Sequence, residues 1–478
     1  MPLVMEDRSG TLTIPVSGTV ARTISAGSLG MWARVTSLSV TLGGLSHWYP
    51  GDLDFLLVGP DGTNLEFWSD AGAGFRIIDR TIATSDFGTS ALPLLTAIPP
   101  SDDPFIPTDW TDATGVETAA YWTGLPAIAV NHPGPTGGGT FAGAFGGAWL
   151  DRSIWQLWVT DDVPYDGGSL RYWSIVMGYQ HIVKPNDFDG NEFSDFLWQN
   201  SDGTPAIWTM SGFTAVSGGA AVNPGPGWHV KGAADFDDDG HADILWQNLD
   251  GTPGIWLMNG LSVLAAGPVG INPGPAWQIK GTGDFNFDGH ADILWQNLDG
   301  TPGIWLMNGM TALAAGPVGT NPGTSWQVRG SGDFNSDGKS DILWQNADGT
   351  PGIWLMNGMT VLAQGPVGTN PGTSWQVKGS GDFNDDGHAD ILWQASDGTP
   401  GTWLMNGMTV LAQGPVGTNP GTAWHVKGSG DYNGDGYSDI LFQHDSGLPG
   451  IWLMNGMSVI TTGPVGSSSP GSDWHLIG

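Results

Sequence analysis

A stretch of 13 residues that recurs six times constrains this chain more than any other feature of its sequence. The copy DFNDDGHADILWQ begins at Asp382, and related copies begin at residues 187, 235, 284, 333 and 431. Successive copies start 48 or 49 residues apart. A constant period of this length indicates stacked supersecondary units that cannot bury their apolar faces alone. We therefore expect residues 180–478 to form one repetitive domain.

Each repeat unit predicts four short strands. In the unit that starts at Trp375 these are WQVKG, ILWQ, GTWLM and MTVLAQG. The acidic loop, the turn SDGTP and the dipeptide Asn406-Gly407, a strong hairpin signal, separate them. Glycine, proline and β-branched residues argue against helices. Four strands joined by tight turns are typical of one antiparallel blade of a β-propeller.

The two ends of the repeat region predict how the ring closes. The chain ends in WHLIG, which is the first strand of a unit without its remainder. The first unit opens with QHIVK, a weak strand that lacks the usual Trp. Pairing of the C-terminal strand into the first blade would remove two free edges. We therefore expect six blades, with seven as the alternative if residues near 170–184 add to the ring.

Every acidic loop has a side-chain oxygen at its positions one, three, five and nine. Calcium binds six to eight oxygen atoms, so this spacing predicts a calcium site in each loop. Position seven varies in type, which suits a ligand provided by the backbone carbonyl and argues against a histidine zinc site. The alternative is a set of polar turns that need no metal. The predicted ligands are Asp187, Asp189, Asn191 and Asp195; Asp235, Asp237, Asp239 and Asp243; Asp284, Asn286, Asp288 and Asp292; Asp333, Asn335, Asp337 and Asp341; Asp382, Asn384, Asp386 and Asp390; Asp431, Asn433, Asp435 and Asp439; and the carbonyls of Phe193, His241, His290, Lys339, His388 and Tyr437.

Composition agrees with cation sites. The net charge is −33, and 43 of the 47 acids are Asp, the short carboxylate found in turns. Without a cation, three or four carboxylates at this spacing would repel one another. About six calcium ions, each at ten times its dissociation constant, would each add about 1.4 kcal/mol to stability. The same charge argues against nucleic acid and anionic membranes as partners.

The repeat units resemble the FG-GAP or VCBS repeats of integrin-type propellers. The resemblance covers residues 180–478, because loop, following strand and period agree six times. It implies calcium in the blade loops. It also implies an extracellular role in adhesion, as a lectin or as an accessory domain of a secreted enzyme.

Residues 1–179 lack the repeat but contain alternating strand patterns such as TLTIPVSG, RVTSLSVTL and WQLWVTDD. They predict an all-β sandwich. The stretches GDL…GPDGT and WQLWVTDD…DGGSLRYW resemble the P domain of proprotein convertases, which implies a jelly roll; an insert at about 88–138 departs from that pattern. Asp52, Asp161, Asp162 and Asp166 are candidates for a further calcium site, with ordinary turn acids as the alternative.

The 26 tryptophans leave two interpretations open. Those in LWQ and IWLM, such as Trp246 and Trp256, fit a buried core. The tryptophan that opens each unit follows an NPG loop and is the better candidate for stacking on sugars. These candidates are Trp228, Trp277, Trp326, Trp375 and Trp424. The glutamine of LWQ, from Gln199 to Gln443, either bonds across blades or faces a ligand.

These features favour a calcium-binding recognition or adhesion protein that is not an enzyme. There is no cysteine, no G-x-S-x-G, no H-E-x-x-H and no phosphate loop. The expected partners are a glycan or a cell-surface protein, with self-association as a further option. The alternatives are a structural subunit of a cell-surface or filamentous assembly and a non-catalytic module of a secreted hydrolase. We expect a secreted or cell-surface location, although MPLVMEDRSG lacks signal-peptide regions and no apolar run is long enough to span a membrane.

Overall fold

The computed structural model describes residues 3–25, 33–59, 63–69, 71, 74–85, 90–92, 98, 104–109, 140–145, 154–181, 184–466 and 469–477. It divides the chain into two compact units, Met1–Ile182 and Val183–Gly478. Among the described residues, neither helical segment is long and apolar enough to cross a membrane. The predicted insert at about 88–138 lies mostly outside the described residues.

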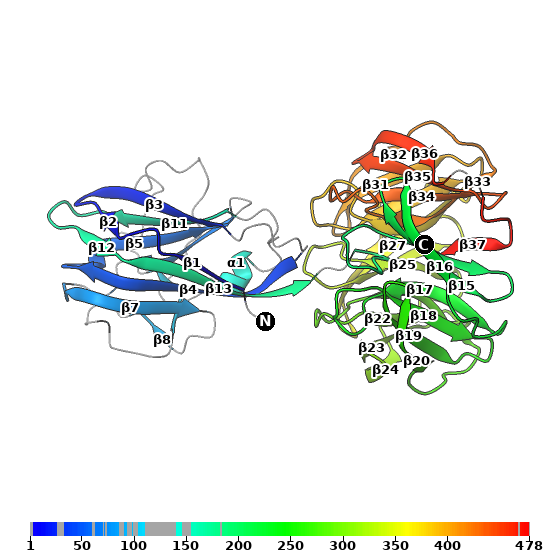
Figure 1. Ribbon diagram of the computed structural model, residues 1–478, viewed down its shortest axis with the longest axis horizontal. Coiled ribbons are helices and arrows are strands. Elements are labelled where there is room, and N and C mark those ends of the chain that lie inside the picture. The colour runs from blue at the N-terminus through cyan, green and yellow to red at the C-terminus, as the bar shows by residue number, and fades with distance from the viewer. Residues whose placement is uncertain are drawn as a thin grey trace. The chain divides into compact units, whose positions relative to one another are not determined.

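The first unit consists of two β-sheets around one apolar cluster (Figure 1). One sheet has the order β1-β13-β4-β7-β9-β8, with β12 and β2 attached, and the other has the order β10-β6-β5-β11-β3. Val40 and Ile175 of the first sheet and Leu57 and Leu157 of the second are fully buried in this cluster. The elements are β1 (Leu3–Asp7), β2 (Leu12–Ile14), β3 (Gly18–Ser25), β4 (Ala33–His47), η1 (Pro50–Asp52), β5 (Leu53–Val58), β6 (Asn64–Ser69), β7 (Ile77–Ser85), β8 (Ser90–Ala91), β9 (Phe105–Ile106), β10 (Thr108–Asp109), α1 (Phe141–Phe145), β11 (Ile154–Asp161), β12 (Gly168–Leu170) and β13 (Tyr172–His181). The all-β prediction for this unit is confirmed, and its jelly-roll connectivity stays a prediction.

The second unit contains six four-stranded antiparallel sheets in the described residues (Figure 1). Five of them follow the chain order, and the first uses the C-terminal strand as its fourth member. In chain order the strands are β14 (Phe196–Asn200), β15 (Pro205–Ser211), β16 (Thr214–Ala220) and β37 (Trp474–Ile477); β17 (Trp228–Ala234), β18 (Asp243–Asn248), β19 (Pro253–Asn259) and β20 (Ser262–Pro268); β21 (Trp277–Gly283), β22 (Asp292–Asn297), β23 (Pro302–Asn308) and β24 (Thr311–Pro317); β25 (Trp326–Gly332), β26 (Asp341–Asn346), β27 (Pro351–Asn357) and β28 (Thr360–Pro366); β29 (Trp375–Gly381), β30 (Asp390–Ala395), β31 (Pro400–Asn406) and β32 (Thr409–Pro415); β33 (Trp424–Gly430), β34 (Asp439–His444), β35 (Pro449–Asn455) and β36 (Ser458–Pro464). This repeated four-strand arrangement is that of a β-propeller.

The opening strands of the sheets form a closed circle. Each of β17, β21, β25, β29 and β33 contacts the next, and β37 contacts both β33 and β17. β37 pairs with β14 in antiparallel register, with Leu476 opposite Trp198. The C-terminal strand therefore completes the first sheet, as its sequence predicted. Tyr172–His181 instead forms β13, which pairs with β1 and β4 in the first unit and adds no strand to the second.

The glutamine that ends the LWQ motif joins each sheet to the next. The side-chain amide of Gln345 donates from Nε2 to the carbonyl of Trp375 at 2.8 Å, and its Oε1 accepts the backbone N–H of Val377 at 3.1 Å. The same pair of bonds recurs for Gln199, Gln247, Gln296, Gln394 and Gln443. Gln443 bonds to β37 and so closes the circle. The sequence left two roles open for this glutamine, a bond across blades and contact with a ligand. The geometry favours the bond across blades.

Tryptophans of the LWQ motif form the core of the sheets. Trp246, Trp295, Trp344 and Trp393 are each about 1% exposed, and each lies about 5 Å from the tryptophan of the following strand. Such large rings fill the space between neighbouring sheets, as the apolar clusters of the second unit show. The aromatic core holds each sheet at a fixed distance from the next.

The variant Gln345→Met tests the cross-sheet amide. It keeps side-chain length but leaves the carbonyl of Trp375 and the N–H of Val377 buried without their partner. We expect a loss of about 2–4 kcal/mol in the free energy of unfolding, measured by urea denaturation. The exposed Gln364 of β28 provides the matched control Gln364→Met. A Gln345→Met protein as stable as this control would contradict the proposed role of the amide.

Candidate functional site

The six acidic loops connect the opening strand of a sheet to its second strand, except in the first sheet, where the loop directly precedes β14. Position nine is the first residue of the second strand in five sheets, as Asp243 is in β18. In all six loops this residue belongs to the buried core and is about 0% exposed. The strand therefore fixes one end of the loop, while the other positions lie at the edge of the sheet.

The carboxylate at position one organises the loop. Asp235 Oδ1 accepts the backbone N–H of Asp238 at 2.7 Å, and its Oδ2 accepts that of Gly240 at 2.9 Å. Asp187 and Asp431 accept the equivalent three backbone N–H groups at positions four, five and six. These bonds wrap the loop around one carboxylate.

Positions four and six of every loop have a left-handed backbone. Gly387 at position six of the fifth loop has φ +83°, in agreement with the expectation that glycine permits the turn there. Glu192 adopts the same conformation in the first loop, with φ +72°. Position four is left-handed as well, although it is Asp238, Phe287, Ser336 or Asp385 in four of the loops. The surrounding hydrogen bonds therefore hold non-glycine residues in a conformation that costs about 1 kcal/mol or more.

The carboxyl at position nine joins the loop to the next strand of its sheet. Asp390 Oδ2 accepts the N–H of Phe383 at 2.9 Å, and its Oδ1 accepts that of Met405 in β31 at 2.8 Å. The same two bonds occur in each of the other five loops. The carboxyl thus couples the acidic loop to the strand that leads into the Asn-Gly hairpin.

The side-chain oxygen at position three lacks a hydrogen bond in every loop. This oxygen is buried and finds no donor among the described residues, whether the side chain is Asp or Asn. The atoms are Oδ1 of Asp189, Asp237, Asn286, Asn335, Asn384 and Asn433. Buried oxygens without partners are rare because each costs about 1–3 kcal/mol. In all six loops, this oxygen is therefore available to a ligand from outside the protein chain.

Position five faces the same space. Asp386 Oδ2 accepts an N–H of the Asn384 amide at 2.8 Å, and its Oδ1 accepts the backbone N–H of His388 at 2.9 Å. In the first two loops the carboxylate oxygens of Asp187, Asp189 and Asp195, and of Asp235, Asp237 and Asp239, lie within 4.8 Å of one another. The structure therefore brings together three of the predicted ligands in each of these two loops.

The histidine side chains at position seven contact the preceding loop. The ring nitrogen Nδ1 of His241 lies 3.0 Å from the carbonyl oxygen of Phe188 in the preceding loop. His290 and His388 make the equivalent contact at 2.9 and 2.8 Å. Through Nδ1, these three histidines therefore link each loop to the preceding one.

The six loops form a closed circle of backbone hydrogen bonds. The N–H at position eight donates to the carbonyl at position one of the preceding loop, as Ala242 does to Asp187 at 2.6 Å. Ser194 donates to Asp431 at 2.8 Å and completes the circle. In addition, the hairpin glycine of each sheet donates to position two of the preceding loop, as Gly260 does to Phe188. A change in one loop is therefore transmitted directly to its two neighbours.

Burial makes the loop carboxylates unfavourable without a cation. It raises the pKa of Asp195, Asp243, Asp292, Asp341, Asp390 and Asp439 at position nine to about 8, and backbone donors only partly oppose this shift. Burial also raises the pKa of Asp187, Asp235 and Asp382 to about 6. Carboxylates of the same loop raise these pKa values further, as Asp386 does for both Asp382 and Asp390. A bound cation would reverse this balance and favour the charged forms.

Two loops already contain a protein cation. Lys184 Nζ lies 2.9 Å from Asp431 Oδ2, so the sixth loop has an ion pair at position one. In the fourth loop Lys339 Nζ lies 4.0 Å from Asp337 Oδ2. Lys184 was not singled out in the sequence, because it lies 247 residues from its partner. We expect these two loops to attract a divalent cation less strongly than the other four.

The predicted acids of the first unit also lie together, around a histidine that the sequence did not single out. His47 Nε2 lies 3.1 Å from Asp161 Oδ2, and Nδ1 lies 3.8 Å from Asp166 Oδ2. Burial raises the pKa of Asp52 to about 6, and Asp162, Asp166 and Asp161 raise it further. All four predicted acids therefore share one region, but whether they bind a metal stays a prediction.

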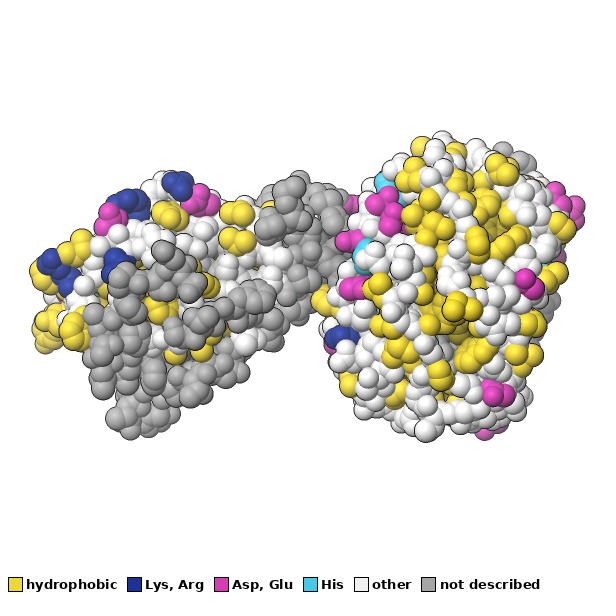
Figure 2. Space-filling model, turned by 90° about the horizontal axis from the view of Figure 1, so that it is seen from below, with side chains coloured by type: hydrophobic (Ala, Val, Ile, Leu, Met, Phe, Trp, Pro, Cys, Tyr) yellow, Lys and Arg dark blue, Asp and Glu magenta, His cyan; other side chains and the backbone are white. Residues whose placement is uncertain are grey.

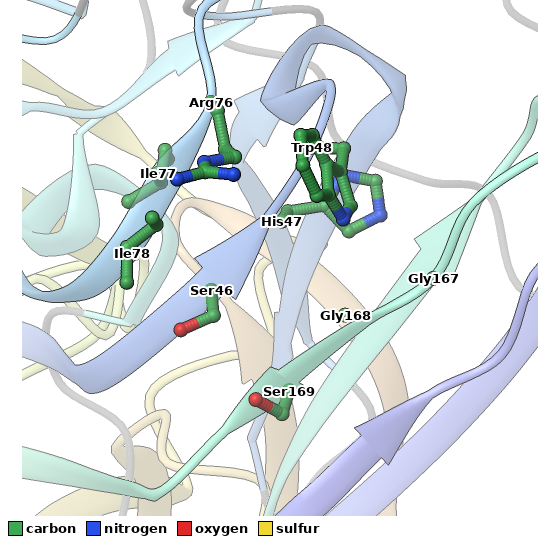
Figure 3. Close-up of a pocket in the computed structure, with 9 residues that line it drawn as sticks. All are labelled: Ser46, His47, Trp48, Arg76, Ile77, Ile78, Gly167, Gly168 and Ser169. Carbon is green, nitrogen blue, oxygen red and sulfur yellow. The ribbon is translucent and has the colours of Figure 1, made fainter.

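A cavity of about 290 Å³ lies beside this histidine (Figure 3). Two of the lining residues contact each other: the guanidinium of Arg76 lies over the Trp48 ring, 4.3 Å from its centre. The lining residues are Ser46, His47, Trp48, Arg76, Ile77, Ile78, Gly167, Gly168 and Ser169. Its polar groups are few, and they do not converge on one point that would identify a ligand.

The tryptophans that open the sheets are half-buried. A β-carbon at Gly352 would lie 3.0 Å from Cζ3 of Trp326, so glycine allows the indole to rest on the backbone of β27. The same contact joins Trp228, Trp277, Trp375 and Trp424 to Gly254, Gly303, Gly401 and Gly450. Part of each ring remains accessible, and its proposed role in ligand stacking stays a prediction.

Comparison with known sequences finds a match for the repeat. The family profile described as FG-GAP-like repeat matches residues 235–295, 284–344, 333–393 and 382–442. Four overlapping stretches of the second unit are therefore similar to this repeat. Each match begins at an acidic loop and ends in the LWQ or LFQ motif of the next sheet, so the FG-GAP-like unit includes the cross-sheet contacts described above. No curated protein matches the chain in sequence.

Several solved structures are similar at low sequence identity. A lectin from Agrocybe aegerita that recognises non-reducing terminal N-acetylglucosamine is 18% identical, with a TM-score of 0.42, over 64% of this chain and 92% of the lectin. A chain of a nidogen/laminin complex is 12% identical, with a TM-score of 0.39, over 59% and 96% of the two chains. The Dos1 propeller is 11% identical, with a TM-score of 0.35, over 59% and 69%. With TM-scores below 0.5, these likenesses carry no argument about function.

The pKa values predict how the cation-free protein responds to pH. The position-nine carboxyls have a pKa of about 8 when folded and about 3.9 when unfolded. Folding therefore binds protons, and this contribution to stability is present below pH ~4 and is lost as pH rises through ~8. After removal of divalent cations, we expect the urea midpoint to be lower at pH 8.5 than at pH 5.5. The variant Asp390→Asn, which cannot titrate, should show a weaker dependence, and a midpoint that rises with pH would contradict the assignment.

Proposed function

We propose that the second unit is a six-bladed β-propeller that binds about six calcium ions in its acidic loops. The observation that carries this proposal is the buried position-three oxygen, which lacks a hydrogen bond in all six loops. Oxygens from positions one, three, five and nine, with the carbonyl of position seven, would hold the ion. A set of carboxylate, amide and carbonyl oxygens is the donor chemistry of calcium. Six divalent ions would bring the net charge from −33 to −21 (−33 + 6 × 2).

Calcium would act here by making the propeller rigid rather than by chemistry on a substrate. The ion would neutralise carboxylates whose burial is otherwise unfavourable, and the circle of loop-to-loop bonds would spread its effect to every sheet. Calcium-binding extracellular modules commonly have dissociation constants of ~10⁻⁴–10⁻³ M. This fits a secreted or cell-surface protein, in which external calcium keeps the folded form populated. The His47 cluster of the first unit is a candidate for one further ion.

The role we propose for the rigid scaffold is recognition or adhesion outside the cell, without catalysis. A ligand class is suggested by the opening tryptophans, because each rests on a glycine and keeps part of its ring accessible. Indole rings stack well on flat faces such as those of sugars, and five equivalent sites would raise avidity. We therefore propose glycan as the leading ligand class, with a cell-surface protein as the alternative partner.

The variant Asn384→Ala tests calcium binding at a single loop. It removes the unpartnered oxygen but leaves the backbone bonds to Asp382 in place. We expect about one calcium fewer per chain by calorimetry or equilibrium dialysis, with an unchanged melting temperature in chelator. The control is Asn346→Ala, because the equivalent residue of the fifth sheet is already Ala395. Equal stoichiometry in the two variants would remove this loop from the set of sites.

A glycan array, run with calcium and with chelator, tests the recognition role. We expect calcium-dependent binding to one class of sugar, with fewer bound sugars per chain in Trp326→Ala than in a control variant of the exposed Trp48. A blank array from folded protein would argue against a lectin. Calcium-dependent self-association would then favour a structural subunit, and turnover of a polysaccharide or peptide would favour a hydrolase module.

A further inference from the structure

Five of the seven Lys and Arg residues in Val183–Gly478 occupy one equivalent position in five opening strands. They are Lys231, Lys280, Arg329, Lys378 and Lys427, the fourth residue of β17, β21, β25, β29 and β33. In β37 the equivalent residue is Ile477. The remaining two cations of the unit, Lys184 and Lys339, belong to the acidic loops. In a unit so rich in Asp, this placement of its few cations requires a physical explanation.

Each of the five cations is the extra residue of a β-bulge. The register between β17 and β18 shifts between Val230 and Gly232, so Lys231 has no partner opposite it. The same shift surrounds Lys280, Arg329, Lys378 and Lys427. The pairing of β37 with β14 has no such shift at Ile477. Bulges redirect a side chain relative to its strand, and here bulge and cation occur together.

The opening strands bring these cations close to one another. Hydroxyl groups bond neighbouring strands two residues after the bulge: Ser331 donates to the carbonyl of Thr282, Ser380 to that of Ser331, and Ser429 to that of Ser380. Residues at equivalent positions of β21, β25, β29 and β33 are therefore neighbours around the axis of the circle. The positive charges of Lys231 and Arg329, after burial, lower the pKa of Lys280, which agrees with this proximity.

The five cations have no anionic partner in the described part of the second unit. Four are half-buried, and Arg329 is more exposed. Residues 184–466 and 469–477 provide no carboxylate within 4.0 Å of any of them. Among the described residues, two of them have a neutral hydrogen-bond partner: Lys280 Nζ donates to Gln278 Oε1 at 3.2 Å, and Lys378 Nζ donates to Gln376 Oε1 at 3.5 Å. Like charges at close range disfavour the folded state unless an anion lies between them.

We infer that the ring of Lys231, Lys280, Arg329, Lys378 and Lys427 binds an oxyanion ligand, a sulfate or phosphate group, at the axis of the second unit. Ammonium and guanidinium groups make short charge-assisted hydrogen bonds to such oxygens. The glutamines two residues earlier in two of these strands, Gln278 and Gln376, add neutral polar groups beside Lys280 and Lys378. The face of the second unit that Figure 2 presents has few Lys or Arg side chains among its hydrophobic and acidic ones, so the ring would be a local exception to the charge of the unit.

The competing account is purely structural. A lysine can pack its alkyl stem along an apolar surface and extend its ammonium into water, which requires no ligand. The two accounts differ in their consequences for charge removal. If the ring is an anion-binding site, replacing one cation by a neutral side chain reduces the repulsion among the cations of the ligand-free protein and stabilises it. If the stems only pack, the same replacement destabilises the protein.

The test is calorimetric titration of the full calcium-saturated chain with sodium sulfate, at ionic strength matched with sodium chloride. We expect saturable binding of about one sulfate per chain. The double variant Lys280→Gln/Lys378→Gln should bind at least about tenfold more weakly and melt at a higher temperature in chloride alone. Arg171→Gln, which removes a cation from the first unit, is the control and should bind as the wild type does.

Two further arms keep the inference open to refutation. Glucose 6-sulfate replaces sulfate in one arm, because binding of the ester alone would identify an esterified ligand rather than the free ion. In the other, Arg329→Lys should retain binding that Arg329→Gln weakens, which tests the ring even if the double variant fails to fold. Absence of saturable binding by both probes would overturn the inference, as would equal binding by Arg329→Gln and Arg329→Lys.

Discussion

The buried carboxyl at position nine of each acidic loop is the interaction on which the second unit most depends. It accepts one backbone N–H from its own loop and one from the third strand of its sheet, in all six sheets. Burial raises its pKa to about 8, so the group that fixes the loop is also the group that most needs neutralisation. A proton can supply this below pH ~8, and a bound divalent cation would supply it at higher pH, where the carboxyl is charged. The folded structure and the proposed cation binding would therefore stabilise each other.

Two circles of hydrogen bonds convert six small sheets into one body. The glutamine amides join each sheet to the opening strand of the next, and the backbone of each acidic loop joins it to the preceding loop. Both circles close through the C-terminal region or the first repeat, at Gln443 with β37 and at Ser194 with Asp431. A four-stranded sheet of this size buries too little surface to be stable alone. The unit should therefore fold and unfold as a whole, with calcium binding as one source of its stability.

The sequence predicted what repeats within a unit, but only part of what joins one unit to another. It offered a bond across blades as one of two roles for the LWQ glutamine, without identifying its partners. The four strands, the hairpin at Asn406-Gly407 and the oxygen positions of the loops follow from local spacing, so a single copy was enough to predict them. The contacts of Gln345 with Trp375 and Val377, and the pairing of Lys184 with Asp431, depend on how sheets pack, which spacing does not encode. Left-handed backbone at Phe287 was unforeseen because a bulky side chain disfavours this conformation. In the first unit the acids were identified, but His47 was missed because it belongs to a different strand.

We propose that the acidic loops bind calcium and that the folded unit depends on it. Both parts can be tested together by the calcium content of the purified wild-type chain, counted by atomic spectroscopy after equilibration, and by its unfolding midpoint in calcium and in chelator. We expect about six ions per chain, or about four if Lys184 and Lys339 weaken their loops, and a large fall in the midpoint when calcium is removed. A chain that retains no calcium and unfolds at the same midpoint in both conditions would contradict this proposal.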